Sequence, residues 1–297
     1  MIRPRRIGHA VFETPDLERQ LVHYTEIIGL VPVARERDRA FLATKLGQLV
    51  VELRRGGEAR CTTLTFEMSP EDDDLFKIGP FLSDEGITFE LRSDPAPGIR
   101  EVLGFNDPKG TKIELFSSWS YIAPNQDVIG AGPLKLGHVA FSVADAKAMA
   151  EFYERVLGFR VSDWIGDFFV FMRCNSDHHT VNFITGRQVG IHHMAFEVKD
   201  FSHLQNACDA FGRKNVQIVW GPTRLGPGHN IAVFHRNPDD QLIELYCELD
   251  QMLDEDLGYF TPRPWHHDTP QRPKVWPHGL NNCWGLPPLP ELNRGRD

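Results

Sequence analysis

Short apolar runs alternate with amphipathic segments along this chain. In the second half, segments with one apolar face predict helices at 145–157 and 200–214. Each helix is followed by three short runs whose apolar pattern favours β-strands. These strands are expected near 159–164, 167–173 and 179–185, and near 216–220, 230–236 and 241–248. Three strands after one helix indicate an α+β fold rather than a doubly wound parallel sheet.

The first half of the chain repeats this pattern. Three pairs of segments align at a nearly constant offset of 129 or 130 positions. They are 7–30 with 136–159, 62–68 with 192–198, and 106–116 with 237–246, where Glu114 matches Glu244. A constant offset over three matches predicts an internal duplication. Each half is therefore expected to hold two strand–helix–strand–strand modules, which pair into an open barrel around a cavity. The helix starts and stops also match, with Asp16 and Asp145 as N-caps and Gly29 and Gly158 as C-caps.

The length of 297 residues fits two domains of roughly 150 residues each. We expect an N-terminal domain at 1–130, a C-terminal domain at 131–250 and an arm at 251–297. The arm is rich in Pro, which disfavours long helices and central strands. It also contains three tryptophans, Trp265, Trp276 and Trp284. Disordered tails are poor in aromatic residues, so the arm is expected to pack on the body or on a neighbouring subunit.

Three polar residues interrupt apolar strands of the second half, namely His138, His193 and Glu244. Taken singly, each would more simply be a structural histidine or a solvent-facing glutamate. Together they are costly to bury unless a cation compensates them. Two imidazoles and one carboxylate can occupy one face of a metal ion and leave the other face open. That arrangement is typical of non-haem Fe(II) oxygenases.

The first half offers a comparison for this ligand set. It has His9 and Glu114 at the equivalent positions, but Thr63 stands where the second half has His193. Threonine is a poor metal ligand. The N-terminal domain is therefore expected to be metal-free and structural.

Composition narrows the class of protein. The net charge of −9 argues against nucleic acid as a partner. Five cysteines without a CxxC pair fit a reduced, cytoplasmic compartment better than a disulfide framework. No apolar stretch approaches the roughly 18 residues of a membrane span, so no membrane partner is expected. Neither a GxGxxG motif after a strand nor a P-loop is present, so no nucleotide cofactor is expected.

With these residues, the chain resembles the two-domain type I extradiol ring-cleavage dioxygenases of the vicinal oxygen chelate superfamily over roughly residues 5–250. The resemblance implies a silent N-terminal domain and an Fe(II) ion, or sometimes Mn(II), held by His138, His193 and Glu244. It implies a catechol-type aromatic diol and O2 as substrates, with no external reductant. The adjacent His192 aligns with a residue that is not a ligand. The arm suggests a homo-oligomer.

The same resemblance suggests residues around the metal. His179, 14 residues before His193, matches the acid–base histidine of the family, while His178 would point the other way on a strand. His229 is a second catalytic candidate at the pocket mouth, although an exposed turn residue is an equally good interpretation. Relatives usually carry His and Tyr where this chain has Leu225 and Phe234, which cannot donate hydrogen bonds. The candidate substrate contacts are Phe168, His192, Leu225 and Phe234, and Val170, Ile184 and Trp220 are further expected cavity residues.

Two other functions are compatible with this scaffold. One is a glyoxalase-type isomerase or lyase that uses Zn(II) or Ni(II). Those enzymes typically draw ligands from two modules, often with a second Glu in place of a His. The other is a non-enzymatic protein that binds an aromatic compound or an antibiotic, usually a short single-domain chain. Two His and one Glu within one half favour the oxygenase.

Overall fold

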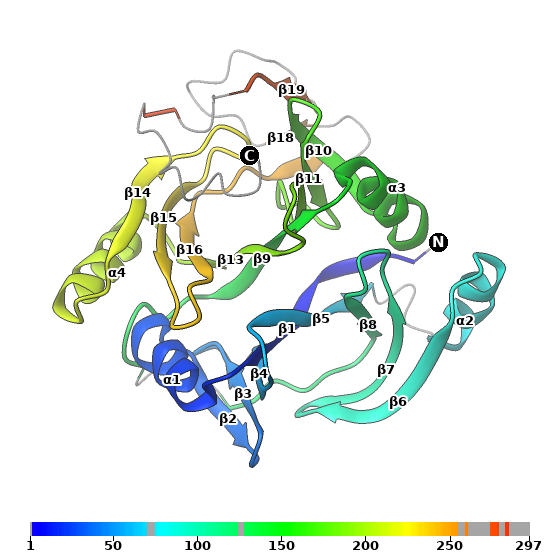
Figure 1. The fold of residues 1–297 in the computed structure, drawn as a ribbon, viewed down its shortest axis with the longest axis horizontal. Coiled ribbons are helices and arrows are strands. Elements are labelled where there is room, and N and C mark those ends of the chain that lie inside the picture. The colour runs from blue at the N-terminus through cyan, green and yellow to red at the C-terminus, as the bar shows by residue number, and fades with distance from the viewer. Residues whose placement is uncertain are drawn as a thin grey trace.

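The structure is a computed structural model that describes residues 2–69, 75–123, 128–254, 259–260, 274–278 and 283–284. Two large curled β-sheets form most of the described structure, and the helices lie at its periphery (Figure 1). Within the described residues, no helix is both long enough and apolar enough to cross a membrane. The central strands of the two sheets touch, and one hydrophobic core contains residues of both halves, such as Phe66 and Phe159.

The first sheet has eight strands in the order β2-β3-β4-β1-β5-β8-β7-β6. Their bounds are β1 Pro4–Thr14, β2 Val31–Arg35, β3 Arg39–Ala43, β4 Leu49–Arg55, β5 Arg60–Met68, β6 Phe89–Ala96, β7 Ile99–Asn106 and β8 Lys112–Phe116. Its helices are α1 Leu17–Val22, which continues as the π-helical turn η1 His23–Ile28, and α2 Leu75–Asp84.

The second sheet has nine strands in the order β14-β15-β16-β13-β9-β12-β11-β10-β19. Their bounds are β9 Lys135–Val143, β10 Arg160–Ile165, β11 Phe169–Arg173, β12 Val181–Thr185, β13 Gly190–Glu197, β14 Ile218–Arg224, β15 Ile231–Arg236, β16 Leu242–Cys247 and β19 Lys274–Trp276. Its helices are α3 Ala146–Leu157 and α4 Phe201–Arg213. If β19 is left out, the two sheets have the same strand order. Strands β9 to β16 take the places of β1 to β8 when one of the two lists is read from its other end. The predicted α+β fold of two repeated halves, each built from paired βαβββ modules, is therefore confirmed.

Local sequence explains where the equivalent helices begin and end. The Asp16 carboxylate accepts a hydrogen bond from the backbone N–H of Arg19, and the Asp145 carboxylate accepts from two N–H groups of the first turn of α3. Gly29 and Gly158 end the helices with positive φ angles of 82° and 63°, which favour glycine. All four predicted caps are confirmed.

Two β-bulges occur at equivalent places in both halves. On β13, Ile191 pairs with Phe141 and His193 pairs with Ala140, so His192 is an extra residue in the ladder. The register of β5 shifts in the same way at Thr62, the equivalent residue. A second shift lies at Gly137 on β9 and, in the first half, next to Gly8 on β1. The backbone irregularities are therefore duplicated along with the regular strands.

Part of the C-terminal arm lies against the second half. The strand β19 lies beside β10 (Figure 1) and pairs with it in parallel. Trp276 is the partner of Ile165 in this pairing. Trp284 packs edge to face on Phe201, with ring centroids 6.5 Å apart. Trp265 lies outside the described residues. A short hairpin of β17 Met252–Asp254 and β18 Tyr259–Phe260 leads from the body into the arm.

Candidate metal centre

Sheet register places the three predicted ligands on one face. Both His138 on β9 and Glu244 on β16 pair directly with Ala195 of β13. Residues that lie opposite one another in a ladder point to the same side of the sheet. His193 lies two positions before Ala195 and therefore shares that side. Three adjacent strands thus bring together residues that are as far as 106 positions apart in sequence.

The three donor atoms form a nearly equilateral triangle. His138 Nε2 lies 3.1 Å from His193 Nε2 and 3.2 Å from Glu244 Oε2, and the third side of the triangle is also 3.2 Å. Ligand bonds of about 2.1 Å at right angles would separate donor atoms by about 3.0 Å. Within the described residues, these three form the group whose geometry could hold a metal ion. The donor set therefore fits a divalent cation that is bound on one face.

The charges at this site fit a metal as well. Burial would raise the pKa of the Glu244 carboxyl, but the neighbouring His138 and His193 outweigh it and lower the pKa to about 2. Burial lowers the pKa of His138, against the opposing influence of Glu244. An ionised carboxylate beside neutral imidazole is the protonation state that a metal requires. All three residues are buried, so the excess negative charge has no access to bulk water.

Hydrogen bonds hold two of the ligands in place. The Asn230 side-chain amide donates to Glu244 Oε1 over 2.8 Å, which leaves Oε2 directed at the two imidazoles. His192 Nδ1 lies 2.7 Å from His193 Nδ1, so the Nε2 atom of His193 remains for the metal. Such outer partners orient ligands and tune their affinity. Asn230 is not among the residues predicted from the sequence, although a polar residue directly before an apolar strand is a usable signal.

His179 lies beside the ligand cluster. Its ring is 4.2 Å from the ring of His138, centroid to centroid, and burial lowers its pKa well below the usual value. The expectation that His178 points the other way is wrong, because its Nδ1 lies 2.9 Å from Nδ1 of His179. Both residues precede β12, outside any strand, so the alternation of strand side chains does not apply to them.

His229 is not an exposed turn residue. It has a positive φ of 49° in the turn before β15, yet it is buried. Its Nδ1 lies 2.7 Å from Asp250 Oδ2, and its ring is 5.6 Å from the ring of Trp276 in the arm. The structure therefore places this histidine between the body and the arm, one residue from Asn230.

The predicted substrate contacts divide into two groups. Phe234 pairs with Glu244 across β15 and β16, and its ring lies 5.9 Å from the ring of His193. The ring of His192 also lies next to His193, so both residues flank the candidate ligands. Phe168 instead packs against His278 of the arm, with the ring centroids 4.8 Å apart. Leu225 packs into a small apolar cluster that includes Phe234. Trp220 stacks on Phe234 at 5.1 Å, whereas Val170 belongs to the main core.

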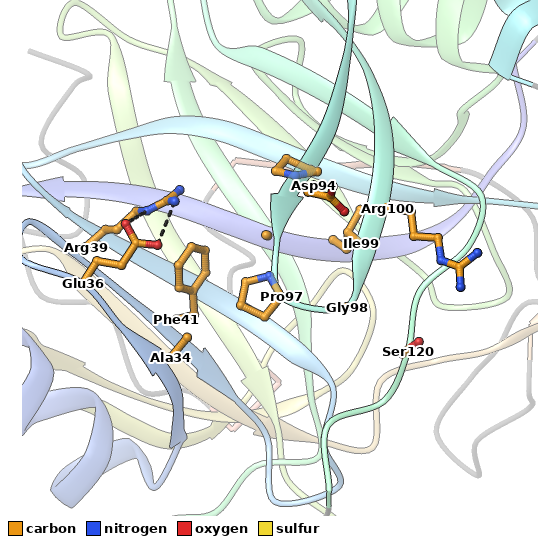
Figure 2. Close-up of a pocket in the computed structure, with 12 residues that line it drawn as sticks. Ala34, Glu36, Arg39, Phe41, Asp94, Pro97, Gly98, Ile99, Arg100 and Ser120 are labelled. Atoms are coloured by element: carbon orange, nitrogen blue, oxygen red, sulfur yellow. Dashed lines mark hydrogen bonds and ion pairs between the residues drawn. The ribbon is translucent and has the colours of Figure 1, made fainter.

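The equivalent site of the first half is built differently. His9 Nδ1 lies 3.1 Å from the hydroxyl of Thr65, and Glu114 forms an ion pair with Arg92. A cavity of about 420 Å³ opens elsewhere in this half, between the β6–β7 hairpin and strands β2 and β3 (Figure 2). It is lined by Phe41 and by the ion pair of Arg39 with Glu36, and it contains none of the three candidate ligands.

Comparison with known proteins gives a consistent result. A sequence profile of the Glyoxalase/Bleomycin resistance protein/Dioxygenase superfamily matches residues 135–245, the segment that carries all three candidate ligands. The chain is 24% identical over 263 residues to metapyrocatechase from Pseudomonas sp. (strain CF600), an alignment covering 82% of this chain and 85% of the relative. It is 28% identical over 181 residues to an iron-dependent extradiol dioxygenase from Rhodococcus jostii (strain RHA1), covering 53% of this chain and 59% of that protein.

A solved structure shares the whole architecture. The Mn(II)-bound glyoxalase from Novosphingobium aromaticivorans superposes with a TM-score of 0.84 and 25% sequence identity, covering 98% of this chain and 94% of that one. The repeated sheets, the clustered His and Glu donors and the relatives agree. Residues 135–245 match the glyoxalase/dioxygenase superfamily, and the chain is similar over most of its length to proteins named as extradiol dioxygenases.

Proposed function

We propose that this protein is an extradiol dioxygenase, which opens a catechol-type aromatic diol with O2 at a single Fe(II) ion. The observation that carries the proposal is the triangle of His138, His193 and Glu244, whose donor atoms lie 3.1 to 3.2 Å apart on one face of the sheet. This geometry leaves the opposite face of a bound ion open for two further ligands. Relatives named as a metapyrocatechase and an iron-dependent extradiol dioxygenase support the same reaction class.

The metal would supply Lewis acidity toward the diol and a route for electrons from the diol to O2. His138, His193 and Glu244 would hold it. Mn(II) is an alternative ion, since a neighbour of the same fold is described as Mn(II)-bound. The domain from 1 to 130 would be structural, because Arg92 and Thr65 already engage its Glu114 and His9.

The residues of this chain would perform the remaining work. His179, which packs on His138, would accept a proton from the substrate and later return it, a role typically worth about 10² to 10⁴ in rate. Phe234 and His192 would bound the space next to His193 and orient an aromatic ring. His229, fixed by Asp250, would keep Asn230 in place against Glu244.

A glyoxalase-type isomerase is the second candidate, because the neighbour from Novosphingobium aromaticivorans is described as a glyoxalase. The ligand set speaks against it. All three candidate ligands lie in one half, whereas the equivalent Glu114 of the other half is paired with Arg92.

Metal analysis and oxygen uptake separate the two candidates. Protein purified without air should contain about one iron or manganese per chain. On mixing with aerated catechols, it should consume one O2 per diol and form a yellow ring-fission product. Zinc or nickel content together with no oxygen uptake on any diol would favour the isomerase. The predicted homo-oligomer can be checked on the same sample by its hydrodynamic mass.

A further inference from the structure

We propose that Asp163 and His178 are positioning residues that hold His179 in one tautomer, and that Trp276 of the C-terminal arm anchors them. The inference rests on the proposed function for the part that His179 plays in catalysis. The arrangement of hydrogen bonds that supports it stands on the structure alone.

The Asp163 carboxylate, on the strand β10 where β19 pairs with it, has three hydrogen-bond partners. Its Oδ1 accepts from the backbone N–H of Lys274 over 2.9 Å, and its Oδ2 accepts from the indole N–H of Trp276 over 2.7 Å. The same Oδ2 lies 3.1 Å from His178 Nε2. Asp163, at 4% exposure, and His178, at 2%, are both buried. The arm therefore fixes the carboxylate that receives the imidazole.

The direction of each hydrogen bond follows from the donor inventory. A carboxylate only accepts, so His178 Nε2 carries the proton of that bond. We assign one N–H to each of the two imidazoles as part of this inference, so Nδ1 of His178 is an acceptor. Nδ1 of His179, 2.9 Å away, must then be the donor. This leaves the lone pair of His179 on Nε2, the form of the ring that can accept a proton there.

Packing holds the rings of His178 and His179 in place. Phe171 contacts both of them, with centroid distances of 5.2 Å to His179 and 6.0 Å to His178. The backbone N–H of His178 donates to the carbonyl of Asp250 over 2.9 Å. A Cβ placed on Gly228 would lie 3.1 Å from His178 Nδ1 and 3.2 Å from His179 Cε1, so the turn closes tightly over the pair. A continuous chain of contacts thus runs from the arm to His138.

Nitrogen NMR of the full-length, metal-free protein tests the tautomer without any enzyme assay. With 15N-labelled histidine, the signals of His179 are assigned by their loss in His179→Gln. We expect the proton on Nδ1 in the wild type. It should stay there in His178→Asn, because the amide oxygen of Asn can accept in place of His178 Nδ1. It should leave in His178→Phe. A proton on Nε2 in the wild type, or no change in His178→Phe, would overturn the inference.

Kinetics of the metal-loaded enzyme give the second test. His178→Phe should lower kcat by about 10²-fold, with KM changed less than about threefold and metal content unchanged. His178→Asn should recover kcat to within about fivefold of the wild type. If both variants lose the same activity, His178 only fills space and the inference fails. If no diol is cleaved by the wild type while the NMR result holds, the proposed function fails and the tautomer assignment stands.

The arm supplies a matched pair of variants. Trp276→Phe removes the indole N–H that donates to Asp163 and should lower kcat by about three- to tenfold. Trp284→Phe, in the same arm, loses no contact with Asp163, because its ring packs on Phe201. It should leave kcat unchanged. Equal losses in the two variants would show that the arm acts only through general packing, which contradicts its assigned role.

Discussion

At equivalent positions of the two sheets, Glu114 and Glu244 are both buried, but different partners neutralise them. Glu114 faces a guanidinium, that of Arg92, and burial raises the pKa of Glu114 although Arg92 opposes this effect. Glu244 faces two imidazoles and the amide of Asn230, and its pKa falls to about 2. The same backbone thus supports either an ion pair or a candidate metal site. A handful of side chains decides which one forms.

The equivalent histidines of the two halves, His9 and His138, also have different partners. His9 is engaged by the hydroxyl of Thr65, at the position where the second half has Ala195. A methyl group at that position leaves His138 free to turn its Nε2 toward His193 and Glu244. The first half therefore differs from the second by more than the absence of one ligand. Its remaining donors are occupied by partners of their own.

The largest expected difference between the halves lies in metal retention. His193→Ala should lose both metal and activity, falling from about one metal per chain to below about a tenth. His9→Ala should keep its metal, because His9 contacts Thr65 and not the ligand triangle. Elemental analysis of both variants after the same purification is the measurement. Loss of metal in His9→Ala would reverse the assignment of the two halves.

A smaller effect is expected from the partner of the carboxylate. Asn230→Ala should weaken metal binding by about 10- to 100-fold, because Glu244 Oε1 loses its donor and the carboxylate can rotate. Competition with a chelator measures the affinity. Arg100→Ala, at the equivalent place 130 positions earlier, lines the cavity of Figure 2 and should leave the affinity unchanged. Equal weakening in both variants would remove the special role of Asn230.

Acid should destabilise the first half through His9. Burial, assisted by Arg54, lowers the pKa of His9 from 6.5 to about 3, so the folded state resists protonation while the unfolded state accepts it. The free energy of unfolding therefore has its full value above pH 6.5, the pKa of this histidine in the unfolded chain. It falls as the pH drops from about 6.5 toward about 3. At about pH 5 the loss is about 2 kcal/mol. Denaturant unfolding should show this loss in the wild type and its absence in His9→Gln. Parallel pH profiles would contradict the prediction.

The smallest expected effect concerns a variant of the first half that should not gain a metal ion. Thr63→His supplies the missing imidazole, but Thr65 and Arg92 still hold His9 and Glu114. Metal content should stay at about one equivalent per chain. Combining Thr63→His with Thr65→Ala and Arg92→Ala should add a weak second equivalent. A second equivalent in the single variant would show that one ligand alone separates the halves.

Much of the fold could be predicted from the sequence, since the internal repeat can be recognised by direct comparison and the helix caps are local patterns that tertiary contacts did not override. The grouping of His138, His193 and Glu244 could also be predicted, because their strands are adjacent in a duplicated sheet. The position of His178 could not. It lies in an irregular turn, where the period of two does not hold. The hydrogen bond between Asp163 and Trp276 could not be predicted either. It joins residues 113 positions apart, and one of them lies in the arm, which has no equivalent segment in the first half.

The bulge at His192 has a practical consequence for protein engineering. In a regular strand, neighbouring side chains face opposite sides, and one residue more or less would turn every later side chain over. The extra residue on β13 changes the side only of the residues before it, because His193 and Ala195 lie beyond it in a regular ladder. A designed barrel could therefore carry the three donors without the bulge. Such a barrel would lose the contact of His192 with His193.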